Sequence, residues 1–516
     1  MDENVIIIGS GIGGLTCGSF LAKHGFKVTI LEQHFKPGGY VTSYKRNGFA
    51  FDVVHVIGGL KKGAPIERIF SYLGIDKKVD FIEVEKTFKF VYPDVTVDCY
   101  ADVNKYEREL INHFPDEKEN IPRYFETKKK IWAEIQESYY RPNLFQMTFY
   151  PLRFPNLVRY QDITYREFLD RFFRNEKLKE ILGSGWGYLG LNSPRISALF
   201  MIGMYMSYHT GGAWFPKGGY QAMSDSFADT FKKLGGVLRL KTGVKRVIVE
   251  KNRAAGVELS TGEKIRAKYI ISNADTKQTF LNLVGEGNLS KGFADKIKGL
   301  RPSVSGFVVH LGVKMDLPEE LNCGCVMSFP DYGTAEEQFK LAERNEMLTD
   351  PAKMGFGLSI STMKDPGLAP DGCHALDIIY MPAPYQYKDR WMSEDKERYK
   401  EFKEKIADNL IKAAEKLVPG LTEHIVVKDI NTPLTYERYT SATEGCWYDA
   451  ACTPDQSLLK RTPSKTPVEG LYLTGAKSFL GPGMFGAINS GMFTADIILK
   501  GKLTCGKIML KEGGQI

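Results

Sequence analysis

The amino-acid sequence predicts an α/β protein that contains a parallel sheet. Three observations support this class. The chain begins with a strand, a glycine-rich turn, a helix and a second strand, all before residue 32. A β-hairpin followed by a buried strand comes near the middle, and a strand that opens into a glycine-rich turn and a helix comes near the end. A length of 516 residues suffices for about three domain-sized units with a large core.

Composition and charge exclude several classes of protein. A hydrophobic fraction of 43% and a charged fraction of 25% are ordinary for a globular chain, so low-complexity disorder and collagen are excluded. The formal charge of +7 is small for this length and predicts no nucleic-acid partner. The chain starts with acidic residues and has no apolar run of about 18 residues, so we expect neither a signal peptide nor a spanning helix. We therefore expect a cytoplasmic protein, with peripheral contact to the inner face of the membrane left open.

The eight cysteines show no paired spacing that predicts a metal site. Cys323 and Cys325 are separated by one residue, and no second pair completes a zinc site. We expect free thiols in a reducing compartment and no bound metal.

The first two strands and the helix between them predict a dinucleotide site. The apolar run Val5–Ile8 is typical of a parallel strand that is buried on both faces. Gly9, Gly11 and Gly14 follow with the spacing GxGxxG, before a helix that is expected to stop at Gly25. The first glycine permits a tight turn, the second lets the backbone approach a pyrophosphate, and the third lets helix and strand pack closely. The helix start adds free N–H groups and a positive dipole end.

Two further features complete this motif. Glu32 follows the second strand, Lys27–Leu31, where a carboxylate can accept the ribose hydroxyls of an adenosine and would repel a 2′-phosphate. Gly38 and Gly39 form a second glycine pair, which lets the backbone pass close to the pyrophosphate and ribityl of a larger cofactor. The glycine turn is expected to share one site with Gly486, near the end of the chain.

The stretch from Gly9 to Gly39 resembles the flavin amine oxidase and phytoene desaturase superfamily, whose members carry FAD at this position. The resemblance implies a Rossmann-like FAD/NAD(P)-binding domain of the glutathione-reductase-like, discontinuous kind, with a mixed-sheet substrate domain and a helical cap. Two positions depart from the family pattern. Tyr40 stands where an arginine is usual after the glycine pair, and Val54 stands where a glycine often follows the aspartate, here Asp52.

A loop in the second half of the chain indicates one branch of this superfamily. Residues 361–374 lie between two expected strands and resemble the SxxDPxxAPxGxH loop of phytoene desaturases, carotenoid isomerases and retinol saturases, with Thr362 at the serine position. The resemblance implies an FAD-dependent oxidoreductase that acts on C–C or C=C bonds of an apolar isoprenoid or polyene lipid. Desaturation, saturation and isomerisation by hydride transfer at flavin N5 all stay open. So do two alternatives: a flavin amine oxidase or protoporphyrinogen oxidase-like enzyme, and a non-catalytic flavin- or lipid-binding protein.

The same resemblance implies that the middle and the end of the chain return to the cofactor. The backbone of Val244 is expected to touch the adenine, and Asn273 is expected to end a strand near the cofactor. A helix that starts near Gly486 would place its positive end near the pyrimidine ring and stabilise an anionic reduced flavin. The full set of implied FAD contacts is Gly9, Ser10, Gly11, Ile12, Gly13, Gly14, Glu32, Gln33, Gly38, Gly39, Tyr40, Val244, Asn273, Gly475, Ala476, Phe485, Gly486 and Ala487.

The same resemblance implies a domain division, and the sequence offers only candidates for a proton donor. We expect residues 1–105, 212–300 and 455–516 to build the FAD-binding domain, and residues 106–211 and 301–454 to build the substrate domain and helical cap. The arginine- and aromatic-rich stretch from Tyr139 to Arg174 fits either the core of that cap or a membrane interface. No catalytic residue is assigned, and the oligomeric state stays open. Candidates for a proton donor, each with a structural role as the alternative, are His55, His209, His310 and Glu444.

Overall fold

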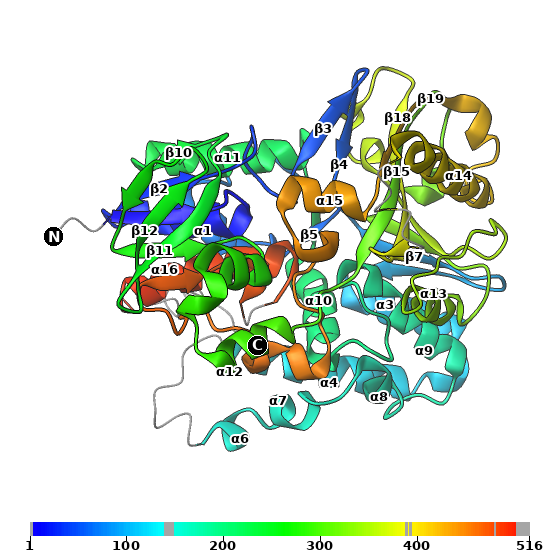
Figure 1. Cartoon of the computed structure of the whole chain (residues 1–516). Coiled ribbons are helices and arrows are strands. Elements are labelled where there is room, and N and C mark those ends of the chain that lie inside the picture. Colours follow the sequence, from blue (N-terminus) through cyan, green and yellow to red (C-terminus); the bar gives the residue numbers. More distant parts are fainter. Residues whose placement is uncertain (1–3, 139–148, 388–390, 392–394, 479–480, 502–516) are drawn as a thin grey trace.

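A five-stranded parallel sheet forms one side of the molecule (Figure 1). The computed structural model describes residues 4–138, 149–387, 391, 395–478 and 481–501. The strand order is β10-β2-β1-β14-β20, and every neighbouring pair is parallel. The strands are β1 (Asn4–Ile8), β2 (Lys27–Leu31), β10 (Val237–Arg239), β14 (Tyr269–Ser272) and β20 (Leu471–Leu473). The beginning, middle and end of the chain thus meet in one sheet, as the sequence predicted.

Both faces of this sheet are covered, which explains the unbroken apolar run of β1. Val5 and Ile7 pack into the core on the side of the helices, whereas Ile6 and Ile8 pack with Val247 on the other side. The covering helices are α1 (Ile12–Lys23), α11 (Gly219–Lys233) and α16 (Gly483–Ile498). The opposite face is covered by the antiparallel strands β11 (Val244–Glu250), β12 (Arg253–Leu259) and β13 (Lys264–Arg266), with α12 (Lys291–Lys298) beside them.

A seven-stranded mixed sheet forms the other side of the molecule (Figure 1). The strand order is β19-β15-β18-β17-β16-β7-β8. These strands are β7 (Lys86–Val91), β8 (Thr96–Tyr100), β15 (Ser305–Val313), β16 (Cys325–Ser328), β17 (Phe356–Ile360), β18 (His374–Ala383) and β19 (Ile425–Asn431). Helix α14 (Lys396–Ala414) packs on one face of this sheet, against Phe307 and Val309 of β15. Helix α13 (Thr334–Ala342) lies nearby. Because β7 and β8 precede residue 105, the first segment of the chain contributes strands to both large sheets.

A group of helices lies below the mixed sheet in Figure 1. They are α3 (Val103–His113), α4 (Asn120–Ser138), α6 (Tyr150–Arg153), α7 (Pro155–Tyr160), α8 (Tyr165–Leu169), α9 (Glu176–Gly183) and α10 (Ala198–Gly211). Many aromatic residues of the arginine- and aromatic-rich stretch are buried here, including Phe154, Tyr160, Tyr165, Phe168 and Phe173. These rings fit the core interpretation. Phe149 and Leu152 are 46% and 79% exposed, and Tyr139, Tyr140 and Phe145 lie outside the described residues.

No helix in the described part of the chain has the length and apolar character needed to cross a membrane. The described cysteines are free, and all but Cys373 are buried.

Short elements join the two sides. They are the hairpin β3 (Ser43–Arg46) and β4 (Phe49–Asp52), the small sheet of β5 (Ile57–Gly58), β6 (Phe81–Glu83) and β9 (Ala213–Pro216), and the helices α2 (Pro65–Leu73) and α15 (Pro433–Thr440). The Asp365 carboxylate, in the loop 361–374, accepts a hydrogen bond from the backbone N–H of Gly218 at 2.6 Å. The Asp52 carboxylate accepts from the backbone N–H of Tyr220 at 2.9 Å. Both sides of the molecule therefore fix the start of α11.

Asp52 is buried, and burial raises the pKa of its carboxyl to about 7, although hydrogen bonds from Ser43 and Tyr220 oppose the rise. An unfolded aspartate has a pKa of about 3.9. The folded protein therefore binds a proton that the unfolded chain releases, and this contribution to stability is lost as the pH rises from about 4 to about 7.

Replacing Asp52 with Asn should remove this part of the pH dependence. Between about pH 5.5 and pH 8.5 the free energy of unfolding should fall by roughly 2 kcal/mol more in the wild type than in Asp52→Asn. Urea unfolding at the two pH values measures the difference. The control is Asp371→Asn, because Asp371 is an exposed aspartate in the loop 361–374 and its variant should follow the wild type. Equal losses in wild type and Asp52→Asn would contradict the raised pKa.

Candidate active site

A cavity of about 550 Å³ lies between the parallel sheet and the mixed sheet. Its lining includes the ends of β1 and β2, through Ile8 and Leu31. From the mixed sheet it includes Met327, Ile379 and Met381. A ligand in this cavity would touch both halves of the fold.

Most residues that the sequence singled out for a cofactor line this one cavity. They are Gly9, Gly11, Ile12, Gly13, Glu32, Gln33, Gly38, Gly39, Tyr40, Val244, Asn273, Ala476, Phe485, Gly486 and Ala487. Ser10, Gly14 and Gly475 are not part of the lining. Gly11 and Gly486 therefore share a site, as expected.

The glycines pack against Asn273 and against one another. A Cβ on Gly11 would lie 2.6 Å from Asn273 Nδ2, and one on Gly475 would collide with Asn273 Oδ1. A Cβ on Gly13 would lie 2.6 Å from Gly475 Cα. Gly9 has a φ of +92°, which favours glycine in its own right. The second glycine pair adjoins the first turn, because the Gly38 N–H donates to the Ser10 carbonyl at 3.0 Å.

Two helices begin at the cavity without a side-chain cap. Among the described residues, no side chain is hydrogen-bonded to the first turn of α1, whose N-cap is Gly11, or of α16, whose N-cap is Pro482. The first N–H groups of a helix lack partners within the helix and carry partial positive charge, so they attract anions and polar oxygens. By contrast, the start of α11 outside the cavity is occupied by Asp52 and Ser43. The two uncapped starts fit a ligand that carries phosphates and carbonyl groups.

The Glu32 carboxylate is fixed in place at the end of β2. It accepts hydrogen bonds from Ser10 N at 2.7 Å, from Ser10 Oγ at 2.8 Å and from His34 N at 2.8 Å. A carboxylate offers about four lone pairs, so acceptor capacity is left for a hydroxyl of a ligand. The site at this end fits a ribose.

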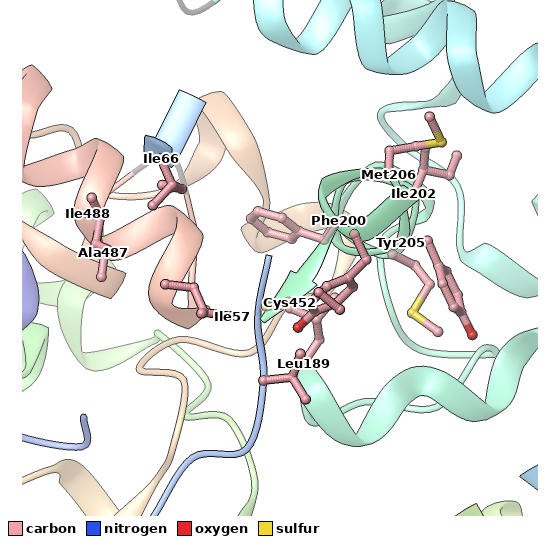
Figure 2. Packing of buried hydrophobic residues seen from close by; sticks show 14 of the residues in the cluster. Ile57, Ile66, Leu189, Phe200, Ile202, Tyr205, Met206, Cys452, Ala487 and Ile488 are labelled. Carbon is pink, nitrogen blue, oxygen red and sulfur yellow. The ribbon is translucent and has the colours of Figure 1, made fainter. Parts of the chain in front are cut away.

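Another part of the cavity is apolar. Trp132 from α4, together with Phe200 and Met204 from α10, joins the methionines of the mixed sheet. The Trp132 and Phe485 rings lie 5.8 Å apart between centroids. Figure 2 shows Phe200 extending from α10 towards the side on which Ile57 and Ala487 lie. Apolar walls with few polar groups suit a hydrophobic ligand.

Tyr40 and Val54, the two departures from the family pattern, both line the cavity. The Tyr40 hydroxyl donates to the Cys446 carbonyl at 2.8 Å. Tyr40 therefore ties the second glycine pair to the segment that follows α15.

The four candidate proton donors are placed differently. His55 lines the cavity, whereas His209, His310 and Glu444 do not. His209 lies between the rings of Tyr106 and Tyr205, and desolvation there lowers its pKa to about 3. His310 is buried in the mixed sheet, and Glu444 is exposed.

Three aspartates near the cavity were not predicted. Asp275 and Asp449 both line it, and burial together with the neighbouring Asp449 carboxylate raises the pKa of Asp275. Asp377 lies behind His55, with its Oδ2 at 3.4 Å from His55 Nε2. A signal for Asp377 existed, because it is the one charged residue in the otherwise apolar run 375–383. No group of side chains in the described residues could hold a metal ion.

The model of the family described as flavin containing amine oxidoreductase matches residues 12–499. The chain belongs to this family. It is an FAD-dependent oxidoreductase, and the glycine turns, the uncapped helix starts and Glu32 fit that cofactor.

Named relatives fall in the branch that the 361–374 loop indicated. The chain is 30% identical over 512 residues to the chloroplastic prolycopene isomerase of Daucus carota, covering 96% of this chain and 79% of that protein. It is 26% identical over 541 residues to the all-trans-retinol 13,14-reductase of Danio rerio, covering 99% of this chain and 86% of the relative. It is 26% identical over 509 residues to the 4,4'-diapolycopene oxygenase of a Methylomonas species, covering 96% of this chain and 98% of that protein.

Solved structures share the fold. An oxidoreductase from Methanosarcina mazei aligns with a TM-score of 0.66 at 19% identity, covering 96% of this chain and all (100%) of the other. A putrescine oxidase variant aligns with a TM-score of 0.63 at 14% identity, covering 96% and 99%. The predicted fold class, a Rossmann-like domain with a mixed-sheet domain and helical cap, is confirmed.

Proposed function

We propose that this FAD-dependent oxidoreductase acts on C–C or C=C bonds of an apolar isoprenoid or polyene lipid. The observation that carries the proposal is the apolar part of the cavity, where Trp132, Met327 and Met381 adjoin the glycine-lined part without a dividing wall. The relatives point to the same class of compound. They are an isomerase of prolycopene, a reductase of retinol and an oxygenase of diapolycopene.

The cofactor contacts and the domain division are part of this proposal. Glu32 and Val244 would hold the adenosine, the turn at Gly11 the pyrophosphate, and the start of α16 at Gly486 the flavin. The complete set is the one implied by the resemblance. Residues 1–105, 212–300 and 455–516 would form the FAD-binding domain, and residues 106–211 and 301–454 the substrate domain and cap.

When bound, FAD supplies hydride exchange with a carbon of the substrate. The residues of the chain have two tasks in that reaction. The apolar side chains from α4, α10 and the mixed sheet orient a hydrophobic chain and exclude water. The helix start at α16 supports negative charge beside it.

Flavin retention tests the cofactor site. Gly11→Leu should abolish it, because a Cβ at this position already lies 2.6 Å from Asn273 Nδ2. Glu32→Lys should weaken it strongly, because it removes the ribose acceptor. The absorbance of the purified proteins near the flavin bands and the FAD released by denaturation measure both effects. The matched control is Gly292→Leu in α12, where a Cβ meets no atom within 4 Å. A yellow Gly11→Leu protein with full flavin content would overturn the assignment.

Conversion of a polyene tests the substrate class. Holoenzyme incubated with prolycopene or all-trans-retinol should give a product with a changed number or geometry of double bonds, seen by chromatography and absorbance. Met327→Lys should lower conversion at least about tenfold with normal flavin content, because it buries an unpaired charge among apolar walls. Oxygen-dependent oxidation of putrescine without any polyene conversion would instead favour an amine oxidase, and a flavin that no donor or acceptor changes would favour a binding protein.

We also propose that the protein is cytoplasmic and contacts the inner face of the membrane through Phe149 and Leu152. Both side chains are exposed, and Arg153, which is paired with Glu137, and Arg159 are exposed on the same helix or the next one, so apolar and cationic groups face solvent in this segment. Such a surface suits the headgroup region of anionic lipids, next to the acyl chains in which an apolar substrate would be dissolved.

Vesicle flotation tests this contact. Wild-type protein should float with phosphatidylglycerol vesicles, and the double variant Phe149→Glu, Leu152→Glu should float several-fold less. Val426→Glu is the control, since Val426 is 52% exposed on β19, away from this helix pair. Equal flotation of the double variant and the control would contradict the proposed surface.

A further inference from the structure

His55 lies at the boundary between the cavity and the mixed sheet. Its side chain is 15% exposed and lines the cavity. Nε2 faces the Asp377 carboxylate, with 3.4 Å between Nε2 and Oδ2. Within the described part of the chain, no hydrogen bond occupies Nδ1 of this ring. One ring nitrogen is therefore fixed by the protein, and the other is available to a bound molecule.

A row of polar side chains continues from Asp377 into the sheet. The other carboxylate oxygen, Oδ1, lies 2.6 Å from His310 Nδ1, and Asn431 Nδ2 lies 2.9 Å from His310 Nε2. His310 pairs in register with Asp377 on β18, and Asn431 lies on the neighbouring strand β19. The side chains of Asp377 and His310 are only 5% and 2% exposed. A continuous line of contacts thus runs from Asn431 to the cavity.

The hydrogen bonds fix the orientation of the His310 ring. The Asn431 amide donates to Nε2 of His310, so that nitrogen is an acceptor, and Nδ1 carries the hydrogen that the Asp377 carboxylate accepts. The carboxylate thus lies between the two rings, with Oδ1 toward His310 and Oδ2 toward His55. Burial would raise the pKa of Asp377, but the contacts with His310 and His55 outweigh it and hold this pKa below its usual value.

Other ionisable groups surround the row. Those that interact electrostatically with Asp377 are Asp52, Lys364, Tyr44, Tyr436 and Cys325. Asp429 on β19 pairs in register with His310. Its carboxylate oxygen Oδ2 lies 3.4 Å from Nε of Arg46. Asp377 is the carboxylate that contacts both rings.

We propose that His55 is the catalytic residue that exchanges a proton with the reacting carbon of the substrate, and that Asp377 and His310 are positioning residues that orient it. This inference rests on the proposed function. In the direction of saturation, the N–H bond of a protonated His55 ring breaks and a C–H bond forms. Bound FAD in its reduced form would supply the second hydrogen, with two electrons, to the neighbouring carbon, and the imidazole would regain a proton from solvent. In the direction of desaturation, His55 would accept the proton and oxidised FAD would accept the hydride.

The first test needs no turnover. Holoenzyme labelled with ¹³C in its eight histidines is examined by NMR at a fixed pH, and the His55 signal is the one missing in His55→Gln. Asp377→Asn should displace that signal, because the ring loses the carboxylate that lies 3.4 Å from its Nε2. Asp377→Glu should restore it. The control variant is Glu109→Gln. It removes the carboxylate that lies 3.3 Å from His113 Nε2 and should not move the His55 signal.

The second test measures chemistry. In anaerobic single turnover with prolycopene or all-trans-retinol, His55→Gln should be at least about a hundredfold slower at unchanged flavin content. Asp377→Asn should change the pH profile of the rate, with little change in KM, and Asp377→Glu should recover the wild-type profile. A merely structural His55 would leave the pH profile unmoved.

Two results would overturn the inference. One is an active His55→Gln enzyme with a wild-type pH profile, and the other is a His55 signal that ignores Asp377→Asn. If wild-type holoenzyme converts none of the probes, the proposed function fails and the proton-exchange role falls with it. In that case a His55 signal that still responds to Asp377→Asn would show the pairing alone, so the two failures are distinguishable.

Discussion

Close packing of backbone around Asn273 is the constraint on which the rest of this structure depends. Its amide fills the space that a side chain on Gly11 or Gly475 would need, and its backbone N–H donates to the Ile8 carbonyl at 2.9 Å. Three segments from the beginning, middle and end of the chain can therefore meet without side chains between them. The uncapped starts of α1 and α16 follow from this meeting, because both helices begin where these turns converge on the cavity. Two helix starts, whose free N–H groups favour anions, thus meet at backbone that only glycine permits.

The cavity changes character because two different sheets border it. The parallel sheet ends in polar backbone and Glu32, whereas the mixed sheet presents Met327, Ile379 and Met381. The two sides have to be held in register for a cofactor and a hydrophobic chain to adjoin. Asp52 and Asp365 serve that purpose, since each accepts a backbone N–H at the start of α11. The loop 361–374, which on the sequence indicated one branch of the superfamily, thus joins the two halves in the structure through the Asp365 carboxylate.

The cofactor side of the site was predictable from the sequence, and the substrate side was not. The turn at Gly9–Gly14 and Glu32 obey short local patterns, so their arrangement follows from chain direction and glycine spacing alone. Trp132 and Met327 carry no such signal, because a residue that lines an apolar cavity has the same periodicity as one in the core. Asp377 is a lone charge in an apolar strand, but its pairing with His310 depends on strand register and its contact with His55 depends on the path of the loop between β4 and β5, neither of which a single sequence reveals.

The presence of Asp377 in the mixed sheet is hard to explain by stability. Burying a carboxylate carries a desolvation cost, and replacing buried ion pairs with apolar side chains of similar volume is often neutral or stabilising. The surrounding residues Val308 and Ile379 show that this sheet packs well with aliphatic side chains. Yet the chain places a carboxylate between two imidazoles, satisfies the far ring through Asn431 and leaves the near ring, His55, at the cavity wall. The His310 ring at the buried end has a partner at both nitrogens, whereas the His55 ring keeps one nitrogen for a bound molecule at the cavity. This arrangement suits proton exchange at the cavity wall. A carboxylate kept only for packing would need neither ring.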